Sequence, residues 1–227
     1  MRLNIAMDGP VGAGKSTVAD AVARRLGILH LDTGAMYRAL GLKALRTGTD
    51  TGNEQAVTAL CRGLDLDVRY SEGGQVTLLD GEDVSALIRT QEVGMAASDV
   101  SRFSEVRKMM VRRQQELAAA TDMLVDGRDI CTTVLPNAPV KVYLTASSEE
   151  RARRRWAEMR QKGLPDTYEE VLKAVVDRDR QDMNRKVEPL RQAEDAVLVD
   201  STDMTFDQVV EAIVKLAEEK IHGESGK

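Results

Sequence analysis

Eight consecutive residues near the start of the chain have the types and spacing needed to hold a nucleoside triphosphate. Gly9-Pro10-Val11-Gly12-Ala13-Gly14-Lys15-Ser16 fits G-x-x-x-x-G-K-[ST] at every position, and Thr17 follows it. The glycines allow backbone N–H groups to turn toward phosphate oxygens, while Lys15 can reach the β- and γ-phosphates. The Ser16 hydroxyl can ligate Mg²⁺. A plain glycine-rich turn and a dinucleotide-binding loop are alternatives, but the apolar run before the motif and the position of Lys15 disfavour both.

A carboxylate that could complete the metal site follows a second apolar run. Met123-Leu124-Val125 reads as a buried strand, and Asp126 comes directly after it. Ligands of open α/β sheets gather at the carboxyl ends of the strands. We therefore expect Asp126 to hold Mg²⁺ through water, although an Asp that ends a strand can also be a simple turn residue.

Three further polar clusters could bind an acceptor of the phosphoryl group. One is the run from Asp32 to Arg38, which follows the second predicted strand, and another is the turn Asp126-Gly127-Arg128-Asp129. The third has spacing i, i+4, i+7, which puts its members on one face of a helix. It comprises Arg178, Asp182 and Arg185. A solvated, salt-bridged helix face is the alternative for this trio.

The elements that must position these residues are short apolar strands alternating with amphipathic helices. This order predicts a doubly wound parallel sheet, an α/β class, covered on both faces. The predicted strands are residues 3–7, 28–31, 123–125, 140–144 and 196–199, and the predicted helices are residues 15–26 (closed by Gly27), 32–46, 103–120, 147–161, 168–180 and 205–221.

A different pattern interrupts this alternation. Residues 64–70 and 75–79 alternate apolar and polar side chains around a turn, which predicts an antiparallel hairpin. Residues 84–88 could add a strand or a helical turn. We expect one P-loop domain over 1–227, with an inserted acceptor-side subdomain at 61–100, a short lid at 154–168 and a flexible tail at 222–227.

Composition restricts the function classes. Asp and Glu number 37 against 32 Lys and Arg, so a nucleic-acid partner is not expected. No apolar run approaches the length of a membrane span, and no leader peptide is recognisable at the N-terminus. The two isolated cysteines, Cys61 and Cys131, form no metal or disulfide pattern, which indicates a reducing compartment. These features predict a cytoplasmic enzyme, and we expect a monomer.

Longer segments of the chain resemble the bacterial cytidylate kinases over nearly its whole length. The matching segments are IAMDGPVGAGKST, LDTGAMYRAL, GEDVSALIRTQEVGMAAS, VRRQQ, VDGRDI, VLPNAPVKVYLTASSEERARRR and RDRQDMNR. GEDVSALIRTQEV belongs to an insertion that distinguishes these enzymes from other monophosphate kinases. The resemblance implies a P-loop nucleoside monophosphate kinase that uses ATP and Mg²⁺ to phosphorylate CMP or dCMP.

The resemblance also implies a role for each matching residue. Thr33, Arg107, Asp129 and Arg185 would surround the cytosine. Ser98, Arg178 and Asp182 would contact the sugar. Arg38 and Arg128 would bind the acceptor phosphate, and the charge on the transferred group would be neutralised by Lys15, Arg38, Arg128 and lid arginines such as Arg154.

Other readings stay open at this stage. A kinase for UMP, AMP or a small metabolite could share the fold, and so could a non-catalytic nucleotide switch. A switch that reads guanine would need an N-K-x-D motif, which the sequence lacks. The chain also departs from the family at Cys131, where a glycine is usual. Cysteine would be strained there if the position needs a positive φ or a close backbone approach. We favour the other explanation, that the position only requires a small residue, in which case Cys131 could place a thiol near the acceptor site.

Overall fold

Five parallel strands form the central sheet of the computed structural model, which describes residues 2–224. Their order across the sheet is β2-β6-β1-β7-β8. The strands are β1 (Asn4–Asp8), β2 (Leu29–Asp32), β6 (Met123–Gly127), β7 (Val140–Thr145) and β8 (Val197–Asp200). All five predicted strands are present within one or two residues, and the parallel α/β architecture is confirmed.

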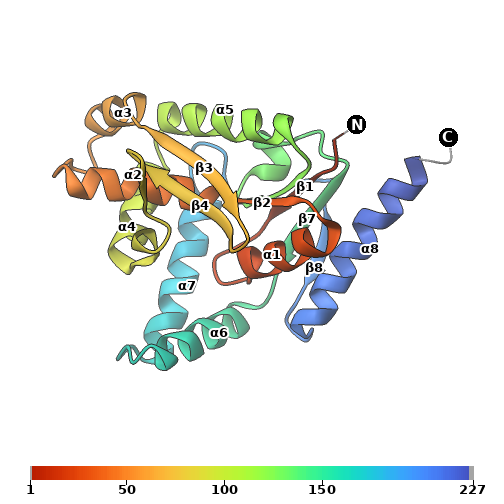
Figure 1. Cartoon of the computed structure of the whole chain (residues 1–227). Coiled ribbons are helices and arrows are strands. Elements are labelled where there is room, and N and C mark those ends of the chain that lie inside the picture. Colours follow the sequence, from red (N-terminus) through yellow and green to blue (C-terminus); the bar gives the residue numbers. More distant parts are fainter. Residues whose placement is uncertain (1, 225–227) are drawn as a thin grey trace.

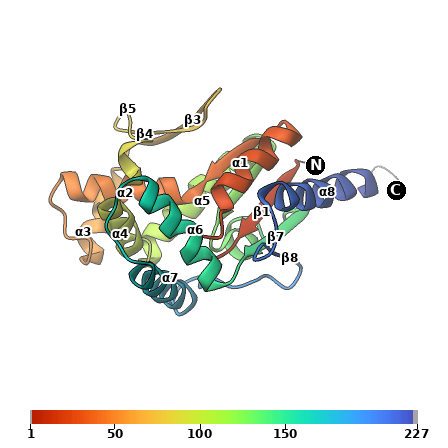
Figure 2. The same cartoon turned by 90° about the horizontal axis from the view of Figure 1, so that it is seen from below.

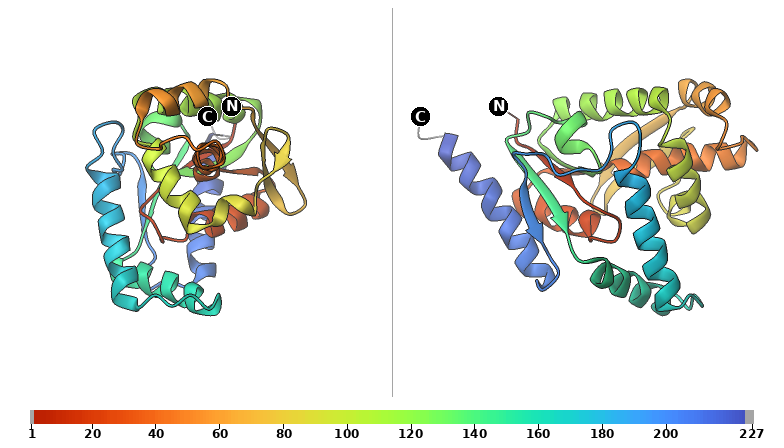
Figure 3. Two further views of the ribbon diagram at one scale, coloured as in Figure 1. Left: turned by 90° about the vertical axis from the view of Figure 1, so that its left-hand side faces the viewer. Right: turned by 180° about the vertical axis from the view of Figure 1, so that it is seen from behind.

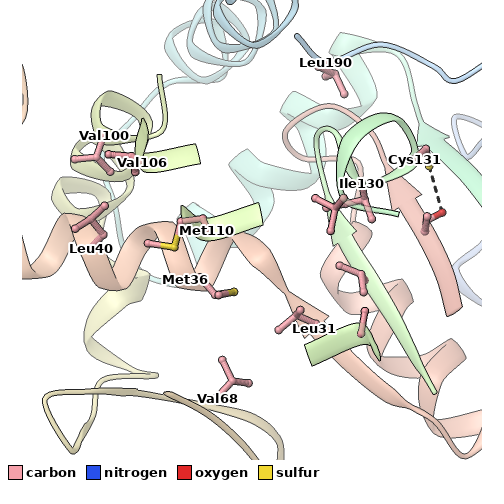
Figure 4. Packing of buried hydrophobic residues seen from close by; sticks show 14 of the residues in the cluster. Leu31, Met36, Leu40, Val68, Val100, Val106, Met110, Ile130, Cys131 and Leu190 are labelled. Carbon is pink, nitrogen blue, oxygen red and sulfur yellow. Dashed lines mark hydrogen bonds between the residues drawn. The ribbon is translucent and has the colours of Figure 1, made fainter. Parts of the chain in front are cut away.

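Side chains alternate between the two faces of this sheet, and each face is covered by helices. Ile5 and Met7 pack on one side with α1 (Lys15–Leu26) and α8 (Phe206–Glu224), whereas Ala6 faces the other side. There it meets α2 (Thr33–Arg46), α5 (Ser104–Ala120) and the short helix η2 (Ile130–Val134). Figure 1 shows this three-layer arrangement, with α8 at one end of the sheet. Figure 4 shows the packing of the second face.

A small antiparallel sheet interrupts the alternation, as the hairpin pattern predicts. It contains β3 (Leu66–Ser71), β4 (Gly74–Leu79) and β5 (Glu82–Asp83), paired in that order. Figure 2 shows this sheet projecting from the body of the molecule beside α2. Residues 84–88 were expected to add a strand or a helical turn. They run into a 3₁₀ turn, η1 (Leu87–Arg89), which begins within them, and β5 lies just before them.

Two helices beside the hairpin have no counterpart among the sequence predictions. They are α3 (Glu54–Arg62) and α4 (Gln91–Val100). Each begins at a polar N-cap, Asn53 or Thr90, whose side chain accepts a backbone N–H bond. Helix α4 packs closely against α2. Because α4 lies within residues 61–100, the inserted subdomain contains more helix than the hairpin pattern indicated.

The segment expected to form a lid, residues 154–168, contains the second half of one helix and the turn that leads into the next. These helices are α6 (Ser148–Gln161) and α7 (Tyr168–Met183), and Figure 3 shows them packed side by side. Residues expected to form a tail are partly helical instead, because α8 continues to Glu224; residues 225–227 lie outside the described residues. Within residues 2–224, no helix is long and apolar enough to cross a membrane.

Candidate active site

The P-loop joins β1 to α1 at the carboxyl edge of the sheet. Gly9 must be glycine, because a Cβ there would lie 1.9 Å from the carbonyl oxygen of Leu144. Gly12 and Gly14 have positive φ angles of 76° and 81°. Gly14 caps α1 without a side chain, so the first N–H groups of the helix remain available for an anion. The loop therefore has the shape and the donors that phosphates require.

Lys15 is folded back into this loop. Its Nζ donates to the carbonyl of Pro10 across 2.9 Å, and the residue is buried. Burial, followed by the charge of Arg128, lowers the pKa of Lys15 to about 7. A bound polyphosphate would add negative charge beside Lys15 and so favour its protonated form.

Ser16 and Asp126 lie side by side, with the hydroxyl donating to Asp126 Oδ2 across 3.1 Å. A hydroxyl and a carboxylate are hard oxygen ligands, which Mg²⁺ prefers. Among residues 2–220, whose side chains the structure describes, no cluster of three or more His, Cys, Asp or Glu side chains could enclose a metal. This set fits a magnesium ion that keeps several waters and shares phosphate oxygens, rather than one fully enclosed by protein.

His30 is a partner of this metal-site carboxylate that the sequence did not reveal. Its Nε2 lies 2.9 Å from Asp126 Oδ1, and its Nδ1 lies 2.6 Å from Asp20. Burial by itself lowers the pKa of His30, but the hydrogen bonds to Asp126 and Asp20 outweigh it and raise the pKa to about 10. Since each ring nitrogen faces a carboxylate, the imidazolium donates to both.

Asp8, at the end of β1, holds the turn that carries Arg128 and Asp129. Its two oxygens accept the backbone N–H groups of Ile130 and Cys131, each across 2.8 Å. Burial raises the pKa of Asp8 to about 6, against the opposing effect of these two donors. Asp8 thus fixes the P-loop strand and the acceptor-side turn relative to each other, a role that the sequence analysis did not identify.

Cys131 causes no strain in this turn, which agrees with a position that only requires a small residue. Its φ is not positive, and its thiol points into the core, 3.5 Å from the carbonyl of Ala6, as Figure 4 shows. Burial raises the pKa of the thiol. The position therefore accepts a small buried side chain, and the thiol does not reach the acceptor side.

Asp182 receives two arginines, one from its own helix and one from the turn after β6. Arg178 Nε donates to Oδ1 across 3.2 Å, which is the i, i+4 pair that the spacing predicts. Arg128 Nε donates to Oδ2 across 3.0 Å. Asp182 is only 4% exposed, so it does not lie on a solvated helix face. Each of its carboxylate oxygens already accepts a hydrogen bond from an arginine, so neither is left for a sugar hydroxyl alone. Although burial raises the pKa of Asp182, the arginines hold it below its ordinary value.

A second ionic cluster brings together Arg107, Asp129 and Glu188. Arg107 Nη2 donates to Asp129, its Nε donates to Glu188 across 2.5 Å, and its Nη1 donates to the carbonyl of Ser101. Its guanidinium also lies 5.7 Å from the centre of the Tyr37 ring. Arg107 is 2% exposed, so it supports Asp129 from beneath rather than standing in open solvent. Glu188 was absent from the predicted site, and it reaches Arg107 from a backbone with a φ of 49°.

An open cavity of about 470 Å³ lies beside these clusters, within the size range of small-ligand sites. Ser98 on α4 and Asp182 on α7 both line it. Arg185 also lines it, and its guanidinium is turned back onto the carbonyls of Val187 and Glu188. Thr33 is placed differently, because its hydroxyl donates to the carbonyl of Asp126 across 2.8 Å, at the junction with the P-loop.

The two remaining predicted arginines, Arg38 and Arg154, differ in their surroundings. Arg38 lies 3.6 Å from Asp32, within the polar edge of the sheet. Arg154 instead donates to Ser201, at the end of β8, and to Glu150. The α6 arginine that contacts the P-loop is Arg151, which donates to the carbonyl of Val11 across 2.9 Å and to Asp179. Arg151, unlike Arg154, was not among the predicted site residues.

Comparisons with known proteins agree with this arrangement. A family profile described as cytidylate kinase matches residues 5–219. A cytidylate kinase from Caldicellulosiruptor bescii is 46% identical over 215 residues, 95% of each chain. One from Shouchella clausii is 49% identical over 216 residues, 95% of this chain and 96% of that one.

A solved structure of an uncharacterised protein from Eubacterium ventriosum has the same fold. It gives a TM-score of 0.51 over 96% of this chain and 99% of that chain, at 11% identity. This likeness concerns the fold alone, whereas the family profile and the sequence relatives span nearly the whole chain. On that evidence the chain belongs to the cytidylate kinase family.

Proposed function

We propose that this chain transfers the γ-phosphate of ATP reversibly to CMP or dCMP, giving ADP and CDP or dCDP. The observation that carries the proposal is the link between the two halves of the site. Asp8 leads from β1 into the P-loop and binds the backbone after Asp129, while Arg128 of the same turn is held by Asp182. A donor held by the P-loop and an acceptor held by these residues would meet at one edge of the sheet.

Transfer between two phosphates needs no protein nucleophile, so alignment and charge neutralisation supply the catalysis. Lys15, Arg38 and Arg128 would supply the neutralising charge, and Arg151 donates to the P-loop carbonyl of Val11. When Mg²⁺ is bound, it would neutralise charge on the β- and γ-oxygens, held by Ser16 and, through water, by Asp126. The contribution of Arg154 is indirect, through its bonds to Ser201.

The acceptor base would be read by Asp129 and Arg185. Cytosine carries an amino donor at N4 and acceptors at N3 and O2. Asp129 can accept from N4, and Arg185 can donate to an acceptor once its guanidinium leaves the carbonyls of Val187 and Glu188. Uracil reverses this pattern at position 4, so it would leave the Asp129 carboxylate facing an acceptor. The sugar would lie between Ser98 and the Arg178–Asp182 pair, and Thr33 and Arg107 would support the base from below.

The two cysteines bear on the cellular compartment expected for the enzyme. Both free cysteines are buried and have raised thiol pKa values, as expected of residues that form no disulfide. We expect a cytoplasmic monomer whose partners are its small-molecule substrates, without a nucleic-acid partner.

Thermal unfolding with single ligands tests this proposal. A ligand that binds only the native state raises the melting temperature, so CMP or dCMP alone should stabilise the protein. UMP and AMP should do so less at the same concentration. A kinase for another monophosphate would reverse this order, and a nucleotide switch would respond to ATP or GTP but to none of the four monophosphates.

A further inference from the structure

Two side chains of the insertion, Gln75 and Arg89, bind Asp32 at the end of β2. Gln75 on β4 accepts the backbone N–H of Asp32 across 2.8 Å. Arg89, at the end of η1, donates from Nη1 to Asp32 Oδ2 across 3.0 Å. Figure 1 shows the hairpin lying across β2 and the start of α2, where Asp32 is found.

Asp32 has one oxygen committed to the fold and one that two arginines can reach. Oδ1 accepts the N–H of Ala35 across 3.0 Å and so caps α2. Oδ2 lies 3.0 Å from Arg89 but 3.6 Å from Nη1 of Arg38. The shorter distance is a hydrogen bond and the longer one is not. Arg89 therefore occupies the oxygen that Arg38 would otherwise take.

Arg38 is left with an unmet donor as a result. Its Nη1 is buried and has no hydrogen-bond acceptor among the described residues. A buried guanidinium donor without a partner is unfavourable, and a phosphate oxygen would satisfy it. The missing hydrogen bond of Nη1 therefore favours the binding of an anion that can accept from it.

We propose that Arg89 is a positioning residue for the acceptor phosphate: by holding Asp32, it keeps Nη1 of Arg38 without a protein hydrogen-bond acceptor and ready for the phosphate of a nucleoside monophosphate. This inference rests on the proposed function, in which Arg38 binds that phosphate. It makes docking of the insertion a condition for tight acceptor binding. Without the bond from Arg89, Asp32 Oδ2 could accept a hydrogen bond from Arg38 and so compete with the acceptor phosphate for this arginine.

The first test compares Arg89→Met with Arg69→Met in steady-state assays of CMP phosphorylation. Arg69 is a matched control, because it lies in the same insertion and its exposed side chain pairs only with Asp67 nearby. Loss of one charge-assisted bond predicts that Arg89→Met raises KM for CMP about 10-fold, with KM for ATP within about 2-fold of the parent value. Arg69→Met should change neither constant. An unaltered KM for CMP in Arg89→Met would overturn the inference.

A second test separates positioning from direct contact between Arg89 and phosphate. Asn can still cap α2, so Asp32→Asn removes the competing charge while keeping the cap. If Arg89 acts through Asp32, adding Arg89→Met to Asp32→Asn should raise KM for CMP by less than about 2-fold, because the two effects are coupled. A full 10-fold effect in that background would show that Arg89 binds phosphate itself and would refute the positioning role.

Arg38→Met in the same assay distinguishes failure of this inference from failure of the proposed site. If Arg38→Met raises KM for CMP but Arg89→Met does not, the acceptor site stands and only the role of Arg89 is wrong. If Arg38→Met also leaves KM for CMP unchanged, the assignment of the acceptor phosphate to Arg38 is wrong, and the inference is refuted with it.

Discussion

Arg128 and Asp182 lie on different elements and are joined by a hydrogen bond from Nε to Oδ2 across 3.0 Å. Arg128 belongs to the turn that Asp8 anchors beside the P-loop, and Asp182 lies near the end of α7. Because Asp182 also holds Arg178, this one carboxylate fixes two arginines that the acceptor site would use. Its removal should therefore affect acceptor binding more than donor binding.

Asp182→Asn should lower kcat/KM for CMP at least about 10-fold, since it removes charge-assisted bonds to both arginines. KM for ATP should stay within about 2-fold. Burial of Asp182 adds an effect that an exposed pair would not show, namely a fall of about 1–3 kcal/mol in the free energy of unfolding. Steady-state kinetics with varied CMP and urea denaturation measure the two effects, and unchanged values in both would contradict the described role.

Arg185→Met should lower kcat/KM for CMP about 10-fold or more, because Arg185 lines the cavity and can donate to the base. Arg180→Met is the matched control, since Arg180 has an exposed side chain near the end of α7. This helix ends at Met183, so Arg185 lies just beyond it and not on the same helical face as Arg178 and Asp182, as the spacing had predicted. The control should keep kcat/KM for CMP within about 2-fold. Equal effects of the two variants would remove Arg185 from the acceptor site.

Lys15→Met should lower kcat by at least about 10²-fold while leaving a folded protein, because Lys15 supplies charge to the transferred phosphate. Circular dichroism checks the fold, and a coupled assay of ADP release measures the rate. Turnover close to that of the parent in a folded Lys15→Met protein would contradict the assignment of residues 9–16 as the phosphate loop.

Binding of ADP should draw a proton onto Lys15. The pKa of Lys15 is about 7 in the free protein, so at pH 8 the amine is mostly neutral. Anionic phosphates favour the charged form and raise this pKa, which means that the proton is taken up on binding. Titration calorimetry in two buffers with different ionisation enthalpies should show more uptake at pH 8 than at pH 6. Lys15→Met should lack that difference, and a parent protein without it would contradict the depressed pKa.

Replacement of Cys131 by glycine, the residue usual in the family, should cost stability but not activity. The thiol fills buried space against Ala6 and Val142, and glycine adds chain freedom to the unfolded state. The expected loss in free energy of unfolding is about 1–2 kcal/mol, with kcat/KM within about 2-fold of the parent value. A large loss of activity without a loss of stability would place the thiol in the catalytic site.

The sheet and the P-loop were predictable because their signals are local. Short apolar runs and the spacing of Gly9, Gly14 and Lys15 follow from the strand and loop geometry itself. Helices α3 and α4 were not predicted, although Asn53 and Thr90 cap them. Both helices are short and lie next to a hairpin whose alternating pattern is the stronger local signal. The π-helical turn η2 has no periodicity that a sequence pattern reveals.

The supporting residues of the site were harder to predict, because their partners are distant in the chain. His30 and Asp126 are 96 residues apart, and Asp8 binds the backbone of residues 122 and 123 positions away. Nothing in the types or spacing of these residues indicates such pairs. Arg151 and Arg154 show the same limit, since both occur in one arginine-rich helix and only the packing determines which one contacts the P-loop.

The most direct test of the account is the rate of ADP release with ATP, Mg²⁺ and each of CMP, dCMP, UMP and AMP as the only acceptor. A carboxylate placed to accept from N4 predicts that kcat/KM for CMP or dCMP exceeds the values for UMP and AMP by at least about 10-fold. Asp129→Ala should reduce this preference together with the rate for CMP. A parent enzyme that phosphorylates UMP or AMP as efficiently as CMP would contradict the central claim.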